Sequence, residues 1–169
     1  MRRIIVALLA MMLSVVGVSA QNYMVVDSEK IFKSIDQYNQ AITQLDQMAN
    51  DYQKQVDAKF EEVEKIYNAY MARRAQLSEA SQQANEENIL KLEKQAQEFQ
   101  ESIFGTDGEL MKKRLELIQP IQKKVFDTID SYAKQKGYDM IIDVSQNATM
   151  LYYSSKADKT NEIIALLKK

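Results

Sequence analysis

A long stretch without either helix-breaking residue constrains the fold of this chain more than any other feature. From Val18 to Phe104 the sequence contains neither glycine nor proline. Through most of this stretch large apolar residues return every three or four positions, which is the spacing of one face of an α-helix. The residues on this face are Ile31, Ile35, Tyr38, Ile42, Leu45, Met48, Tyr52, Val56, Phe60, Val63, Tyr67 and Tyr70. A helix of about 50 residues far exceeds the mean length of about 11–12, so the pattern predicts a helical arm.

The first twenty residues are typical of an export signal. Two arginines precede an apolar run, and the run ends in the small residues Val18-Ser19-Ala20. This order predicts a signal peptide over residues 1–20, with Gln21 as the first residue after cleavage. An uncleaved membrane anchor is the alternative, because the apolar run is close to the shortest length that spans a bilayer.

The composition argues against several classes of function. The chain has no histidine and no cysteine, which removes Ser-His-Asp and Cys-His catalysis and the usual zinc sites. Glu61, Glu62 and Glu64 are best interpreted as a solvated helix face. We therefore predict no enzyme activity, no catalytic residues, no metal and no cofactor. Without residues 1–20, the 22 basic residues fall to 20 against 24 acidic ones, and this net charge of −4 does not predict nucleic-acid or anionic-membrane binding.

A polar segment in the middle of the chain predicts where the helix reverses direction. From Ser78 to Asn88 the large apolar residues stop, and then the apolar face resumes. Its next members are Ile89, Leu92, Ala96, Phe99 and Ile103. Ser78 and Ser81 are suitable caps for a returning helix. One continuous rod is the alternative, since Ala, Gln and Glu favour helix, but a helix with a single apolar face needs a partner. We expect an antiparallel hairpin with its tip near residues 78–88.

Two glycines interrupt the returning arm at Gly105 and Gly108. They indicate either a hinge partway along the arm or a kinked turn without a special role. The apolar face then continues to Tyr132, and Pro120 predicts a kink within it. Gly137 after Lys136 predicts the end of the helix.

The two ends of the chain carry strand signals. Residues 23–26 predict a short strand, 138–144 a strand with a mostly buried centre, and 149–153 a further strand before a short last helix. The expected layout is a β body from residues 21–27 and 138–169, with the hairpin arm over 28–137. Because an open three-stranded sheet leaves edges that can pair with another chain, we predict a homo-oligomer. The residues expected at its interface are Met140, Ile142, Val144 and Leu151.

Several of these segments resemble the Skp/OmpH-like family of periplasmic chaperones. The resemblance lies in Met24–Asp27, Pro120-Ile121, Gly137–Asp143, Leu151–Ser155 and Asp158–Thr160, in addition to the export signal and the long hairpin. It implies a mainly helical α+β fold, in which three hairpins project from a shared β-barrel of a homotrimer. It also implies a periplasmic, ATP-independent holdase that keeps unfolded outer-membrane β-barrel proteins from aggregating in a cavity between the arms.

This chain departs from the family's frequent basic character. From Asp46 to Glu101 it has 12 acidic and 7 basic residues, which weakens the carry-over of electrostatic capture and of lipopolysaccharide binding from the family and leaves membrane contact open. Client contact would then depend on apolar and aromatic side chains near the tip, for which Tyr67, Tyr70 and Met71 are the candidates. Alternatively, these three residues pack between the two helices of the hairpin. A structural or adaptor coiled coil of the cell envelope is the alternative function.

Overall fold

The computed structural model describes residues 22–146 and 149–168. The expected signal peptide, residues 1–20, lies outside them. The chain divides into two compact units, which we call the hairpin unit (Phe32–Asp127) and the sheet unit (Met1–Ile31 with Thr128–Lys169). The division falls inside two helices, whereas the sequence-based layout placed the boundaries at residues 28 and 137.

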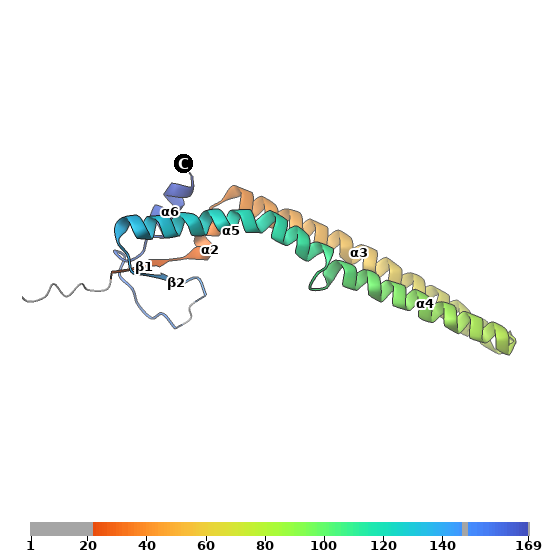
Figure 1. Cartoon of the computed structure of the whole chain (residues 1–169). Coiled ribbons are helices and arrows are strands. Elements are labelled where there is room, and N and C mark those ends of the chain that lie inside the picture. Colours follow the sequence, from red (N-terminus) through yellow and green to blue (C-terminus); the bar gives the residue numbers. More distant parts are fainter. Residues whose placement is uncertain (1–21, 147–148, 169) are drawn as a thin grey trace, which may run out of the picture. The chain divides into compact units, whose positions relative to one another are not determined.

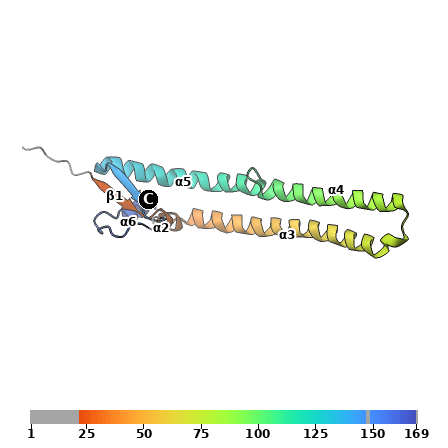
Figure 2. The same ribbon diagram turned by 90° about the horizontal axis from the view of Figure 1, so that it is seen from below.

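The hairpin unit consists of two antiparallel helical layers (Figures 1 and 2). One layer is α3 (Asp36–Arg73), and the other is α4 (Glu79–Phe104) followed by the first part of α5 (Glu109–Lys136). The predicted long antiparallel hairpin is therefore confirmed. Apolar residues at helical spacing hold the layers together. Those most deeply buried in this unit are Ala41, Leu45, Val56, Tyr70, Ile89, Ala96, Ile103, Ile118 and Val125.

The chain reverses earlier than the sequence predicted. A short 3₁₀ helix, η1 (Arg74–Gln76), follows α3, and α4 already begins at Glu79. The predicted tip near residues 78–88 is therefore too late in the chain, because most of that polar segment forms the first turns of α4. Its residues favour helix, and they lack apolar side chains because this part of α4 is mostly exposed. The predicted cap is confirmed, since the Ser78 hydroxyl accepts a hydrogen bond from the Ser81 N–H at 3.3 Å.

A break near the start of the arm was not predicted. Helix α2 (Ser28–Lys33) ends before Ile35, which has an extended backbone (φ −99°, ψ 114°) and precedes α3. The side chain of Asn39 donates a hydrogen bond to the Lys33 carbonyl at 2.9 Å. This bond satisfies one of the carbonyls that the end of a helix leaves without a partner.

The two glycines of the returning arm form a tight loop between α4 and α5. A Cβ atom on Gly105 would lie within 3.0 Å of the Glu101 carbonyl oxygen, and one on Gly108 within 3.0 Å of the Ile103 carbonyl oxygen. Glycine is needed at both positions because the backbone approaches so closely. Helix α5 then continues through Pro120. A hinge at Gly105 and Gly108 stays a prediction.

The sheet unit contains two parallel strands, β1 (Tyr23–Val26) and β2 (Met140–Asp143), with Val25 opposite Ile142. Its core consists of Met24, Val25, Val26, Ile31, Ile129, Ala133 and Ile163. The last of these residues lies in α6 (Thr160–Leu167). Helix α5 ends as predicted at Gly137, whose φ of +70° favours glycine.

The predicted third strand at residues 149–153 is wrong, because these residues have no strand structure. In its place, residues 157–159 occupy the edge of β1 that faces away from β2. The Val25 N–H donates to the Ala157 carbonyl at 2.8 Å, and the Lys159 N–H donates to the Val25 carbonyl at 2.8 Å. Strand β2 also lacks the buried centre that the sequence predicted, since Met140 and Ile141 are exposed.

Candidate functional site

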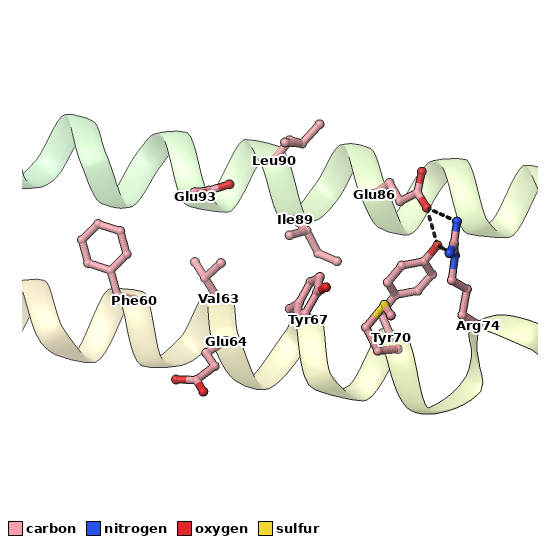
Figure 3. Close-up of a pocket in the computed structure, with 11 residues that line it drawn as sticks. Phe60, Val63, Glu64, Tyr67, Tyr70, Arg74, Glu86, Ile89, Leu90 and Glu93 are labelled. Carbon is pink, nitrogen blue, oxygen red and sulfur yellow. Dashed lines mark hydrogen bonds and ion pairs between the residues drawn. The ribbon is translucent and has the colours of Figure 1, made fainter.

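An open groove lies between α3 and α4 close to the turn of the hairpin (Figure 3). We call it the tip groove, and its volume is about 640 Å³. Its apolar and aromatic lining consists of Phe60, Val63, Tyr67, Tyr70, Met71, Ile89 and Leu90. The charged residues that line it are Glu64, Arg74, Glu86 and Glu93. The volume lies within the range of about 300–1,000 Å³ that is usual for ligand pockets.

The tip groove presents large apolar side chains to solvent. Tyr67 and Met71 are each 46% exposed, and Leu90 is 64% exposed. Single exposed apolar residues are ordinary, but several that line one groove are typical of an interaction site. Two of the three predicted contact residues, Tyr67 and Met71, therefore lie together on an accessible surface.

The third predicted contact residue, Tyr70, is buried and only 3% exposed. Its hydroxyl donates to Glu86 Oε1 at 2.6 Å and accepts from Arg74 Nε at 3.0 Å. Arg74 Nη2 also lies 3.4 Å from Glu86 Oε1. Burial raises the pKa of Tyr70, and the hydrogen bond to Glu86 raises it further. The neutral hydroxyl thus links α3 to α4, as the alternative interpretation of this residue expected.

The Tyr70–Arg74–Glu86 network was not predicted from the sequence. Tyr70 and Arg74 are four residues apart and hence neighbours on a helix, which is the one local signal of their contact. Their partner Glu86 lies on the returning helix. Because the tip was predicted too late in the chain, Glu86 was not expected to lie opposite them. Locating the reversal correctly at residues 74–78 would have placed Glu86 opposite Tyr70.

Two glutamates give the tip groove an acidic character. Glu64 comes from α3 and Glu93 from α4. Neither forms an ion pair with another described residue, whereas Arg74, the single basic residue of the lining, is engaged with Glu86 and Tyr70. The accessible charge at the groove is therefore negative.

The hairpin unit has a second exposed apolar area on α5. Leu115 and Phe126 are exposed and line a shallow groove with Pro120. Phe126 also makes an edge-to-face ring contact with Phe32, with 6.2 Å between the ring centroids. This area was not predicted from the sequence, although Leu115 and Phe126 lie outside the periodic apolar face and were recognisable for that reason.

The predicted interface residues lie in the sheet unit, where much of their surface is accessible. Leu151 is 94% exposed and Met140 is 51% exposed, while Ile142 and Val144 are half-buried. Tyr152, which was not predicted, is also exposed. Apolar surface of this kind is typical of regions covered by a partner, and the homo-oligomer stays a prediction.

Within residues 22–146 and 149–168, no cluster of three or more carboxylates is arranged to hold a metal ion. Over the same residues, every helix is too short or too polar to cross a bilayer.

The fold and the groove together define the class of this protein. It is a mainly helical protein in which a long antiparallel hairpin is combined with a small parallel sheet unit. The sequence model of the family described as outer membrane protein (OmpH-like) matches residues 22–167, and the chain belongs to this family. This is a periplasmic chaperone family for outer-membrane proteins and is not known for enzymes. The resemblance seen in the sequence is thereby confirmed. Comparison with curated proteins gives no match.

Proposed function

We propose that this protein is an ATP-independent holdase of the periplasm. It is exported with a cleaved signal peptide and binds unfolded outer-membrane β-barrel proteins in a cavity between helical arms. By holding them, it prevents their aggregation. The observation that carries the proposal is the match to the OmpH-like family over residues 22–167.

Two features of the structure support this function. Strands of outer-membrane barrels alternate apolar and polar residues, so the unfolded proteins expose apolar side chains to water. The tip groove offers Tyr67, Met71 and Leu90 as accessible apolar partners for them. A second such area lies on α5. Several weak apolar contacts along one client give avidity without reading its sequence.

The working unit is a homotrimer that assembles through the sheet unit. Met140, Leu151 and Tyr152 support this assignment, because isolated chains would leave these apolar side chains in water. Three hairpins around one client multiply the number of contacts. Because the three arms belong to one assembly, binding by one arm raises the effective concentration of the other two near the client.

A dilution experiment tests the proposal. A urea-unfolded outer-membrane barrel protein is diluted into buffer with the purified mature protein, and aggregation is followed by light scattering. We expect a stoichiometric amount of trimer to suppress scattering without ATP. A structural or adaptor protein of the envelope would leave scattering unchanged, and this result would refute the holdase function.

The assembly is tested separately by measuring the molar mass in solution. Leu151→Glu places a charge where the interface is proposed and should dissociate the trimer. Leu90→Glu introduces the same change at an exposed position of the hairpin and should leave the trimer intact. If the Leu151→Glu protein keeps the mass of a trimer, the interface lies elsewhere.

A further inference from the structure

We propose that the tip groove selects, among the unfolded barrel proteins of the proposed function, extended apolar segments that carry lysine or arginine at their polar positions. This inference rests on the proposed function for the origin of the segments. It goes beyond that function because it assigns a sequence preference to a particular site.

The shape and lining of the groove suit an extended chain. Alternate residues of an extended segment point to the same side and lie about 6.6–6.8 Å apart. The groove of about 640 Å³ has an apolar lining and remains open to solvent. Neighbouring side chains of one apolar face can therefore enter it and contact the exposed side chains of Tyr67, Met71 and Leu90.

Part of the lining of the groove is held in place before any client binds. Tyr70 lines the groove and is almost fully buried, and its hydrogen bond to Glu86 joins the two helices. A binding surface that is already ordered loses less conformational entropy when it is occupied. The tip groove is thus a better candidate for binding than an equally apolar but mobile surface.

The charge around the groove decides which segments it accepts. Glu64 and Glu93 approach it from the two helices without ion-pair partners, and Arg74 is engaged by Glu86. The polar side chains of an entering strand point out of the groove, and the long stems of lysine and arginine allow their charges to turn back toward these two carboxylates. Lysine and arginine are attracted there, while aspartate and glutamate are repelled.

The same charge disfavours two other occupants. From Asp46 to Glu101 the hairpin carries 12 acidic and 7 basic residues, so a second copy of the hairpin would be repelled. An anionic membrane surface would be repelled for the same reason. An unfolded segment with basic residues is the occupant that both the apolar lining and the charge favour.

Labelled peptides of about twelve residues test this preference. Two peptides share the same alternating apolar residues, and one carries lysine where the other carries glutamate. Binding to the mature protein is measured by fluorescence anisotropy. Exposed ion pairs contribute little individually, so two carboxylates should favour the lysine peptide by about threefold to tenfold. This preference should shrink when salt is raised from 0.05 to 0.5 M, as expected for screened charges.

Charge variants locate the preference. Glu64→Gln combined with Glu93→Gln should abolish most of it. Glu62→Gln combined with Glu98→Gln makes the same change of charge on the same two helices at positions that do not line the tip groove, and should preserve it. Equal losses in the two double variants would mean that the net charge of the hairpin, rather than the groove, sets the preference, and would overturn the proposal.

An apolar variant tests the groove itself. Leu90→Ser should weaken binding of both peptides at least threefold and leave helicity unchanged, since Leu90 is largely exposed. Unchanged binding would overturn the assignment of the groove. If Leu90→Ser lowers the molar mass of the assembly, the groove is an interface between copies, and the proposal is likewise wrong.

The two proposals fail in different ways. If the protein suppresses aggregation but binds the lysine and glutamate peptides equally, the holdase function stands and the groove preference is wrong. If the peptides bind as expected but aggregation is not suppressed, the groove is a peptide site and the holdase function is wrong.

Discussion

Replacing Leu45 by alanine should destabilise the hairpin unit more than any exposed leucine. Leu45 is 8% exposed and lies in α3, where it forms a buried cluster with Ala41 and with Ile118 of α5. The change removes three carbon atoms, and each buried carbon contributes about 0.8 kcal/mol. The transfer loss is therefore roughly 2.4 kcal/mol, and the cavity left behind raises the total to about 3 kcal/mol.

A urea titration followed by circular dichroism at 222 nm measures this loss. With a slope of about 1–3 kcal/mol per molar urea, the unfolding midpoint should fall by about 1–3 M. All samples need the same protein concentration, because association makes the apparent stability depend on concentration.

Leu90→Ala is the matched control, since the same three carbons are removed from a side chain that is 64% exposed. Its cost should stay below about 1 kcal/mol, because only the buried share of the surface is lost. If the two substitutions lower the midpoint equally, burial between α3 and α5 does not hold the hairpin together, and the reasoning is refuted.

Three further substitutions test other parts of the structure. Gly108→Ala should lower the melting temperature and the helical signal, because its Cβ would collide with the Ile103 carbonyl; an unchanged melting temperature would contradict the tight loop. Ser78→Ala should cost about 1 kcal/mol in urea unfolding through loss of the cap on α4, and a neutral result would place the start of that helix elsewhere. Asp143→Asn tests a pH dependence. Burial raises the pKa of Asp143, but hydrogen bonds from Ser28 and Ser145 outweigh this effect and hold the pKa below its usual value. Wild type should therefore be more stable than Asp143→Asn at neutral pH, and this advantage should fade as the pH falls below about 4, the pKa in the unfolded chain; an advantage that grows at low pH would contradict this.

Periodicity revealed the helices of this protein well because their apolar residues face a single neighbour. The apolar face that begins at Ile31 and resumes at Ile89 indicated two antiparallel layers, and the structure has them. The tip was misplaced because exposed helix and loop have similar polar compositions. The segment after Ser78 lacks apolar residues in either case, and only its helix-favouring residues distinguished the two.

The sheet was harder to predict because strand pairing depends on residues that are distant in sequence. The apolar and aromatic residues at 149–153 suggested a strand, but strand propensity depends strongly on context. The hydrogen bonds of Val25 to Ala157 and Lys159 occupy the edge of β1 that such a strand would need. No local pattern in the sequence announces this pairing.

The candidate site was predictable only where helical periodicity and position along the arm were sufficient. Tyr67 and Met71 were identified from their place near the tip, and both are accessible in the tip groove. The linking role of Tyr70 depends on the register between the two helices, which in turn depends on the position of the reversal that was misplaced. Leu90 was missed because it lies beside the periodic apolar face rather than on it.

The most direct test of the holdase function compares two states of one client. An outer-membrane barrel protein is labelled and offered to the mature protein either unfolded from urea or folded in detergent micelles, and binding is measured by anisotropy without ATP. We expect a complex with the unfolded protein and none with the folded one, because folding buries or covers the alternating apolar residues. Binding of the folded barrel alone, or equal binding of both states, would contradict the function proposed for this protein.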